Sequence, residues 1–495
     1  MKKIKKVALL LIAVSVLFAG GCGQNSQNSQ TGQNNENGQN ETTEPYALTK
    51  SEYVNLVSDV YGGDPAALVC GDTVYIYTGH DTSPNDSYVI PEYLCYSSQD
   101  MKTWKSEGVV MKMSDVSWAD KNSAWAGQVA EYNGKFYLYF CSWDSTSSGK
   151  QSIGVAVSDS PTGPFVDIGA PLVKGTMTTN QSSDWNDIDP TVWIEDGHRY
   201  LMWGNGKVYL CELNEDMISV KDQNGDGEIH FGADIIEKPA PGSYTEAPWL
   251  YRRADADGNY YGEYYLFYAS SWREELSYAT TDDLWKGRLV YSDTIMEHSA
   301  TSNTNHMAVI DFKDKTYFIY HNGALPGGSG FRRSVCIAEV EFRDDGSICV
   351  IDESTSGLFG TTTTISTEAG AVAHKKYRNS GADSAYPYKD VEVAIGLSDG
   401  ADAEWVICNG KTETSDEFMV SIQSENKPGL YLTVSDGAIV LSQDDKGDLG
   451  DAQTFRTYKS PEGILFESVK EEVKYITVDE NGKLVLGEGT AFTLQ

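Results

Sequence analysis

The sequence predicts an all-β protein, in which a five-bladed β-propeller is followed by a smaller all-β, β-trefoil-like domain. Three observations support this prediction. Five similar segments recur at a spacing of about 60 residues, and apolar and aromatic residues alternate along strand-length runs. Almost no segment after residue 45 has the periodicity of a helix, and the aromatic pattern stops near residue 360.

The five segments share a small or polar start, an apolar strand, a turn rich in Gly, Asp or Asn, and a second strand dense in Tyr, Phe and Trp. They begin at Asp64, Gly127, Asp189, Ala247 and Asn305. Each segment is followed by further strand-like runs, so one unit has the four strands of a propeller blade. Five such units close on themselves around an axis, whereas a β-sandwich lacks so long and regular a period.

The first strand of each blade lines the central channel of a propeller, so residues at equivalent starts are expected to converge there. Those positions are Asp64, the Trp125–Gly127 region, Asp189, Glu246 and His306. Neighbouring buried carboxyl groups shift one another's pKa values, as acid–base catalysis requires. A single Asp before Pro is usually only a turn residue. Three acids in register with a five-fold repeat instead predict one catalytic funnel.

Residues 1–21 are expected to be a processing signal rather than part of the fold. A basic start precedes an apolar run, Val7–Phe18, that is too short to span a membrane comfortably. Small residues then lead to Cys22, which resembles the lipidation site of a bacterial lipoprotein exported to the outer face of the cell membrane. A plain secretory signal or a short membrane anchor is the alternative. Residues 22–45 are polar and predict a flexible tether.

The composition excludes several classes of protein. The formal net charge of −34 argues against nucleic-acid binding and against a basic membrane-binding surface. Beyond Cys22 the cysteines are odd in number and include no CxxC pair, which predicts buried free thiols rather than disulfides or a zinc site. They are Cys70, Cys95, Cys141, Cys211, Cys336, Cys349 and Cys408.

One loop has part of a calcium-binding pattern. Residues 222–228, DQNGDGE, have the spacing at which an EF-hand begins, but Ala233 stands where the bidentate acid is expected. The motif therefore predicts a polar hairpin loop, with calcium binding as the alternative.

At the blade starts the sequence resembles glycoside hydrolase family 43, over roughly residues 50–355. The matching motifs are GGDPAALV, WNDIDPTVWI, YTEAPWLY, NHMAVIDFKDKTYFIYH and GFRRSVCIAEV. The resemblance implies a five-bladed propeller enzyme that cleaves arabinofuranosides and β-xylosides with inversion, which needs two separated carboxyl groups with water between them. It implies that Asp64 is the general base and Glu246 the general acid. An ionised Asp189 would raise the pKa of this acid and orient it.

The resemblance also implies roles for residues around the acids. His306 would lie at the propeller axis beside a calcium ion, although a structural role or a water-filled channel is equally consistent. Arg333 would contact the sugar at the cleavage site, with a salt bridge as the alternative. Trp125, Trp185 and Trp249 lie next to the catalytic positions and either stack on sugar faces or pack in the core.

The propeller catalytic domain is expected over residues 46–358 and the second domain over residues 359–495. Two similar stretches begin at Val420 and Ile464, near the spacing of one unit of a threefold β-trefoil. With the intervening GDAQTFRTY they resemble the arabinose-binding trefoil of arabinofuranosidase B. Thr433 and Val434 stand where that family often places a sugar-binding His, so sugar binding and a purely structural role both stay open.

The leading hypothesis is an inverting, exo-acting glycoside hydrolase that removes α-L-arabinofuranosyl residues from arabinoxylan-type hemicellulose. Its partner would be a plant cell-wall polysaccharide or oligosaccharide, and no organic cofactor is expected. A β-xylosidase acting on xylo-oligosaccharides is the runner-up. A non-catalytic sugar-binding surface lipoprotein is an alternative of a different class, against which the three acids argue.

Overall fold

The computed structural model describes residues 43–146, 149–178, 184–377 and 388–495. The predicted signal at residues 1–21, Cys22 and almost all of the predicted tether lie outside the described residues. Within the described ranges, no helix is long and apolar enough to cross a membrane.

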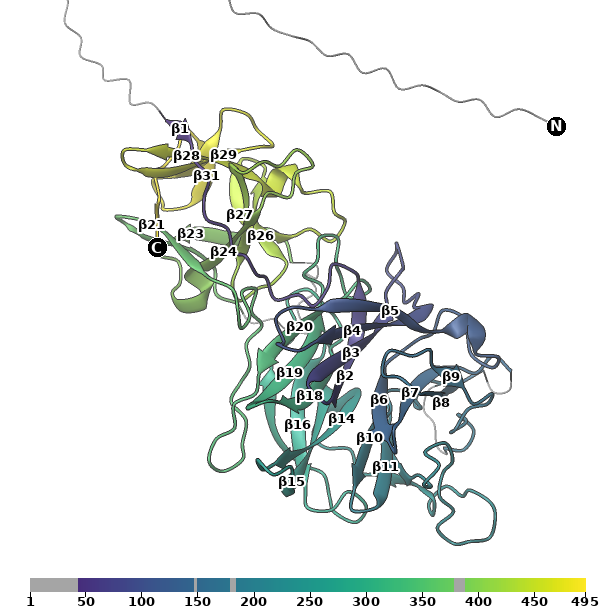
Figure 1. The fold of residues 1–495 in the computed structure, drawn as a ribbon. Helices are drawn as coiled ribbons and strands as arrows, with labels where there is room; N and C mark the ends of the chain where they lie inside the picture. The colour runs from purple at the N-terminus through teal and green to yellow at the C-terminus, as the bar shows by residue number, and fades with distance from the viewer. Residues whose placement is uncertain (1–42, 147–148, 179–183, 378–387) are drawn as a thin grey trace, which may run out of the picture. The chain divides into compact units, whose positions relative to one another are not determined.

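Five separate antiparallel sheets form the blades of the propeller (Figure 1), and in each of them the strands follow one another in chain order. The first two blades are β2 (Gly62–Cys70), β3 (Thr73–His80), β4 (Glu92–Ser98) and β5 (Lys105–Lys112), then β6 (Gly127–Tyr132), β7 (Lys135–Trp143), β8 (Gln151–Ser158) and β9 (Val166–Asp167). The next two are β10 (Thr191–Glu195), β11 (His198–Trp203), β12 (Val208–Glu212) and β13 (Ile235–Lys238), then β14 (Tyr244–Ala254), β15 (Tyr260–Ser270), β16 (Glu275–Thr281) and β17 (Val290–Met296). The fifth is β18 (Met307–Phe312), β19 (Lys315–Asn322) and β20 (Ser334–Glu339).

The burial of the strands explains their composition. The second strand of a blade is packed on both faces by neighbouring blades, so β7 reads KFYLYFCSW and buries seven consecutive residues. Outer strands have one edge and much of their surface in solvent, and β17 accordingly begins with four exposed residues. Aromatic side chains therefore collect between the blades, which is the pattern that the sequence repeat predicts.

The fifth blade differs from the prediction of four strands, because only three strands are assigned to it. The segment before β2 lies along β20 and closes the ring. The amide of Val57 donates to the carbonyl of Val335 (3.0 Å), and the amide of Ile337 donates to the side-chain oxygen of Asn55 (3.0 Å). The start of the propeller thus covers the edge of its last blade.

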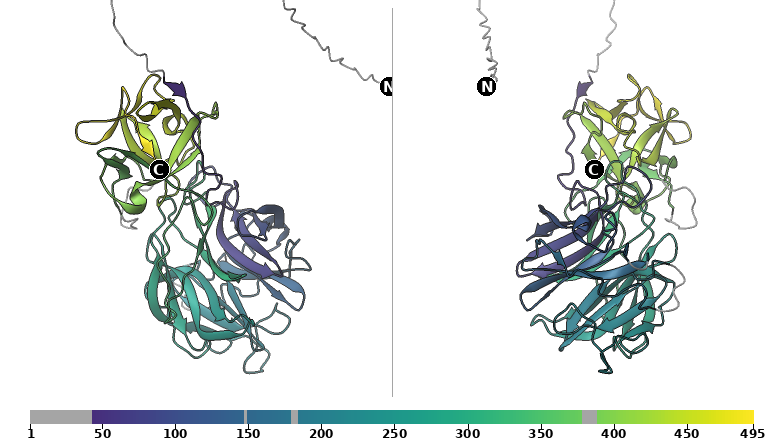
Figure 2. Two further views of the ribbon diagram at one scale, coloured as in Figure 1. Left: turned by 60° about the vertical axis from the view of Figure 1, so that its left-hand side comes forward. Right: turned by 90° about the vertical axis from the view of Figure 1, so that its right-hand side faces the viewer.

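The second domain is one closed antiparallel sheet, because β25 pairs with both β24 and β28 and β26 pairs with β27. Its core includes the buried side chains of Trp405, Phe455 and Phe466. Its strands are β21 (Thr363–Thr367), β22 (Gly370–His374), β23 (Val391–Ile395), β24 (Glu404–Asn409), β25 (Met419–Ser424), β26 (Leu430–Ser435), β27 (Ala438–Gln443), β28 (Phe455–Ser460), β29 (Gly463–Ser468), β30 (Tyr475–Val478), β31 (Leu484–Gly487) and β32 (Thr493–Leu494). Figure 2 shows these strands (green to yellow) and the blades (purple to green) from two further sides.

The remaining elements are short. The sequence places residues 44–45 in the tether, but they form strand β1 (Glu44–Pro45), which pairs with Tyr458 and Lys459 of β28. Three 3₁₀ turns are present among the described residues, η1 (Met113–Asp115), η2 (Gly400–Ala403) and η3 (Asp451–Gln453). The seven described cysteines are free, as predicted, and four of them are buried.

Asn55 is the residue whose loss tests the closure of the ring. It is buried, and besides accepting from Ile337 it donates to the carbonyl of Ser354 (3.1 Å). We expect Asn55→Ala to lower the free energy of unfolding by about 1–3 kcal/mol, because buried backbone groups lose their partners. Chemical denaturation measures this change. Asp59→Ala, on an exposed residue of the same segment, is the control, and equal effects of the two variants would contradict the assignment.

Candidate active site

The three predicted catalytic acids converge on one cavity of about 420 Å³. Asp64 lies on β2, Asp189 lies just before Pro190 and β10, and Glu246 lies on β14, so three different blades supply them. The cavity has the size of a small-molecule site and is lined by apolar as well as polar groups. Of the other predicted residues, Trp125, Trp185, His306 and Arg333 also line it.

The backbone is irregular where the acids leave their strands. The φ angles of Asp64 (52°), Asp189 (61°) and Ala247 (58°) all fall in the left-handed region, which is unfavourable for residues other than glycine. The pairing of β2 with β3 shifts between Gly63 and Ala66, and that of β14 with β15 shifts on both sides of Glu246. Bulges of this kind re-aim side chains, and here they occur at the positions of the acids.

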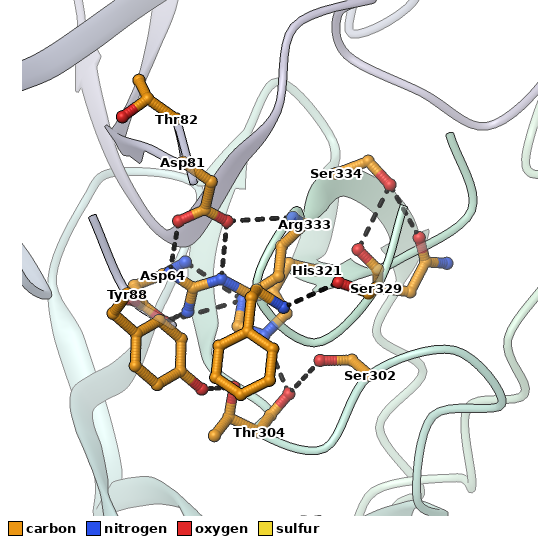
Figure 3. A network of polar contacts seen from close by, with 12 residues as sticks. Asp64, Asp81, Thr82, Tyr88, Ser302, Thr304, His321, Ser329, Arg333 and Ser334 are labelled. Carbon is orange, nitrogen blue, oxygen red and sulfur yellow. Dashed lines mark hydrogen bonds and ion pairs between the residues drawn. The ribbon is translucent and has the colours of Figure 1, made fainter. Parts of the chain in front are cut away.

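Arg333 is the centre of the polar network at the cavity (Figure 3). Its Nε and Nη2 donate to the two carboxylate oxygens of Asp81, both at 2.9 Å, and its Nη1 donates to Oδ1 of Asp64 at 2.6 Å. Only 2% of the surface of Arg333 is exposed. The guanidinium group is therefore fixed by a bidentate ion pair while its third nitrogen binds the predicted base.

Gly63 allows this guanidinium group to approach the backbone. A Cβ atom built on Gly63 would lie 2.1 Å from Cζ and 2.1 Å from Nε of Arg333. A side chain at residue 63 would therefore displace Arg333. The ion pair can form only because the second residue of the GGDP motif is a glycine.

His321 orients the base from the other side, and sequence analysis did not identify it. The backbone amide of Asp64 donates to Nδ1 of His321 (3.0 Å), and Nε2 of His321 faces the carbonyl of Thr304 (2.9 Å). An amide only donates and a carbonyl only accepts, so the proton is on Nε2. Burial and the charge of Arg333 lower the pKa of His321 to about 3, which keeps the ring neutral.

The two ends of the site have opposite electrostatics. Burial by itself raises the pKa of Asp64, but the charge and the hydrogen bond of Arg333 lower it below its ordinary range. Burial raises the pKa of Glu246 to about 7, assisted by the charge of Asp64 and opposed by hydrogen bonds and by Arg333. One carboxyl group is therefore held ionised and the other is protonated up to neutral pH.

Asp189 is expected to be ionised, but its surroundings favour the protonated form. Its Oδ2 accepts a hydrogen bond from the amide of Ala247 (2.9 Å), which links it to the residue after Glu246. Burial and the nearby Glu246 raise the pKa of Asp189 well above its ordinary value. Burial, rather than repulsion by an ionised Asp189, is thus the main cause of the raised pKa of Glu246.

Two further residues at Glu246 carry no signal in the sequence repeat. The side-chain amide of Asn205 donates to Oε2 of Glu246 (2.6 Å), and Asn205 lies in the loop after β11. Glu274 is 1% exposed, lies immediately before β16 and also lines the cavity. Both residues belong to positions after the second strand of a blade, where the repeat predicts only turns.

The tryptophans divide into two groups. Trp125 and Trp185 line the cavity, and 49% of the surface of Trp185 is exposed. Trp249 instead packs in the core, 4% exposed, and its Nε1 donates to the carbonyl of Val309 (2.9 Å) in the next blade. Trp272, which sequence analysis missed, is 64% exposed and lines the cavity, so it is available for stacking on a sugar face.

The residue predicted to lie beside a calcium ion at the propeller axis is His306. His306 lines the cavity, and burial lowers its pKa to about 4, so it presents a neutral imidazole. Calcium takes about six to eight oxygen ligands. Across the described part of the chain, no group of three or more His, Cys, Asp and Glu residues is arranged to hold a metal ion. The calcium ion stays a prediction, and no step of the reaction is assigned to it.

The EF-hand-like loop uses its acids internally. The carboxylate of Asp222 accepts hydrogen bonds from the amides of Asn224, Gly225 and Gly227 at 3.1, 2.6 and 2.7 Å. The carboxylate of Asp226 is within hydrogen-bond distance of Nε2 of His230 (3.0 Å). The acidic side chains of this polar loop thus form hydrogen bonds within the loop itself.

Comparisons with known proteins agree with this geometry. The chain is 28% identical to a xylosidase/arabinosidase of Bacteroides ovatus over 347 residues, which cover 61% of this chain and 98% of that protein. It is 26% identical to an arabinoxylan arabinofuranohydrolase of Paenibacillus polymyxa, over 75% of this chain and 65% of that protein. A solved family 43 enzyme of Xanthomonas citri, in complex with xylose, matches 60% of this chain and 92% of its own with a TM-score of 0.51 and 25% identity.

The family model of the glycosyl hydrolases family 43 matches residues 53–348, a span that contains all five blades and every acid of the cavity. This span is more than half of the chain, and its propeller carries the carboxyl groups that glycoside hydrolysis requires. The chain therefore belongs to glycosyl hydrolase family 43.

Proposed function

We propose that this enzyme is an inverting, exo-acting α-L-arabinofuranosidase that removes arabinofuranosyl side groups from arabinoxylan. The observation that carries the proposal is that Asp64, bound by Arg333, and Glu246, bound by Asn205, line one cavity. In these surroundings their pKa values shift in opposite directions, down for Asp64 and up for Glu246. Groups whose environments push their pKa values apart are suited to act as base and acid in one reaction.

In the proposed reaction, the carboxylate of Asp64 removes a proton from water as the water attacks the anomeric carbon. Glu246 donates its proton to the glycosidic oxygen, so the leaving hydroxyl departs neutral. Asp189 restrains the backbone beside Glu246 through the amide of Ala247. Arg333 holds Asp64 ionised and lines the cavity, and in this proposal it contacts the sugar.

The choice of substrate is supported by the relatives and by the cavity. The curated relatives include arabinoxylan arabinofuranohydrolases of Paenibacillus polymyxa and Bacillus subtilis. The exposed rings of Trp185 and Trp272 offer apolar faces on which a xylan main chain can stack while its side group enters the cavity. β-Xylosidase activity is the second candidate, because a relative from Xylanibacter ruminicola is a β-xylosidase with 28% identity.

The first test is sugar release by the wild type, Asp64→Ala and Glu246→Ala from wheat arabinoxylan and from para-nitrophenyl α-L-arabinofuranoside and β-xyloside. Loss of the base is expected to lower kcat roughly 100- to 10,000-fold on both kinds of substrate. Loss of the acid is expected to harm arabinoxylan cleavage more, because para-nitrophenolate leaves as an anion and needs no proton from the enzyme. Glu275→Ala, outside the cavity, is the control. A wild type that releases neither sugar would overturn the proposal.

The pH dependence of kcat/KM follows from the two pKa shifts. Glu246 must be protonated, and its pKa is about 7, so activity on arabinoxylan is expected to fall as the pH rises through about 7. Asp64 must be ionised, and its pKa is lowered, so the acidic limb is expected below the ordinary range of an aspartate. Rate measurements from pH 3 to 9 test this. Full activity persisting to pH 9 would contradict the assignment of the acid.

We further propose that the enzyme is exported and lipid-anchored through Cys22. The sequence before this residue supports the proposal, since a basic start and a short apolar run end in small residues. Cells grown with labelled palmitate are expected to label the wild type and not Cys22→Ala. Equal labelling of the two proteins would count against the anchor.

A further inference from the structure

Glu274 is a buried carboxyl group for which the reaction described above has no use. It lies at the end of the loop between β15 and β16, on the same blade as Glu246. In this sheet Glu246 pairs with Ala269, and Ala269 pairs with Leu276, so the loop turns back beside the general acid. Glu274 also lines the catalytic cavity, although it is 1% exposed.

The position of Glu274 is fixed by the neighbouring blade. The backbone amide of Asn305 donates to its Oε2 (2.8 Å), and the side-chain amide of Asn305 donates to its backbone carbonyl. Side chain and backbone of Glu274 are thus held by one residue. Glu246 and Glu274 line the same cavity, and a hydrogen bond from Glu274 is one of the causes that lower the pKa of Glu246.

A hydrogen bond between two carboxyl groups requires that one of them carries a proton. The titratable groups that act on Glu274 are Glu246, Asp189 and Asp64, all of them acids. The cation of the site, Arg333, is bound by Asp64 and Asp81. Burial, followed by the repulsion of Glu246, raises the pKa of Glu274 well above its ordinary value. Below neutral pH both carboxyl groups are therefore protonated. The proton of Glu246 is the one given to the substrate, so Glu274 is the donor in the hydrogen bond that joins them.

We propose that Glu274 is a positioning residue, which holds the general acid Glu246 in place by donating a hydrogen bond from its neutral carboxyl group. The inference deepens the function proposed above and rests on it. Asn205 donates to Oε2 of Glu246, and Glu274 supplies a second donor, so the side chain is held at two points while its own proton is directed to the substrate.

The hydrogen bond also adjusts the acidity of Glu246. Burial raises the pKa of Glu246, and the hydrogen bonds from Asn205 and Glu274 lower it again. Without the donor at residue 274, Glu246 would bind its proton more tightly and would be free to rotate. A general acid with too high a pKa transfers its proton poorly, so both effects reduce the rate.

The variants Glu274→Gln and Glu274→Ala separate this role from its alternatives. The amide of glutamine has an oxygen to accept from Asn305 and an NH₂ group to donate to Glu246, so Glu274→Gln imitates the neutral acid. We expect its kcat on arabinoxylan to stay within about threefold of wild type, with the same alkaline limb. Glu274→Ala is expected to lower kcat about 10- to 100-fold at similar KM and to move the alkaline limb to higher pH. Glu275→Gln, on the adjacent residue, is the control.

Two kinetic results would overturn the inference. A Glu274→Gln enzyme as inactive as Glu246→Ala would mean that Glu274 transfers a proton itself or acts as an anion. A Glu274→Ala enzyme with wild-type kcat and pH profile would mean that it does not position the acid. Inactivity of the wild type on every substrate, by contrast, removes the proposed function.

A measurement without substrate tests the neutral state of Glu274 independently, whatever the activity of the protein. A buried acid with a raised pKa loses stabilising free energy as the pH rises above its value in the unfolded chain, whereas glutamine does not titrate. The difference in Tm between Glu274→Gln and wild type is therefore expected to shift in favour of the variant from pH 5 to 8. A shift in favour of the wild type would show that Glu274 is a stabilised anion, which contradicts the inference.

Discussion

The buried ion pair of Arg333 with two carboxylates is the interaction on which the rest of the site depends. Asp81 holds the guanidinium group in a bidentate contact, and the remaining nitrogen binds Asp64 at 2.6 Å. A buried charge is costly unless it is paired, and each member of this group depends on the others. The positive charge is consequently located at one side of the cavity. Asp64 is ionised there in spite of its burial.

Among the described residues, the other acids of the cavity have no ion pair of this kind with a cation. Asp189, Glu246 and Glu274 come from the third and fourth blades, and burial raises the pKa of all three. Glu246 thus keeps the proton that the leaving group needs, whereas Asp64 has lost its proton and can activate water. The division of roles between chemically similar groups thus follows from the placement of one arginine.

The same ion pair joins the two ends of the propeller. Asp64 and Asp81 belong to the first blade, whereas Arg333 immediately precedes the last strand of the fifth. The amide of Gly62 donates to the carbonyl of Arg333 at 2.7 Å, and the Val57–Val335 hydrogen bond continues this seam. The same contacts therefore close the ring and keep Asp64 ionised. Gly63 makes these contacts sterically possible.

The sequence predicts the parts of this arrangement that follow from its repeat, and only those. Equivalent blade starts place Asp64, Asp189 and Glu246 in one cavity, because the period of the repeat determines which strands face the axis. Asp81, His321 and Glu274 are set by contacts between blades, and no local pattern distinguishes them from ordinary polar residues. Trp249 is predicted to bind substrate because it lies close to Glu246 in the sequence. Its ring packs in the core instead, because alternate residues of a strand point in opposite directions. The fifth blade has three strands because the segment before β2 supplies its last edge.

The claim that Arg333 separates the ionisation of two similar acids can be tested directly by ¹³C NMR. Protein labelled at the Asp and Glu carboxyl carbons would be titrated, with Asp64→Asn and Glu246→Gln used to assign the two signals. The structure predicts that Asp64 is ionised throughout the range above pH 5, while Glu246 titrates near 7. Titration of Asp64 near neutral pH, or of Glu246 in the ordinary range of a glutamate, would contradict this account.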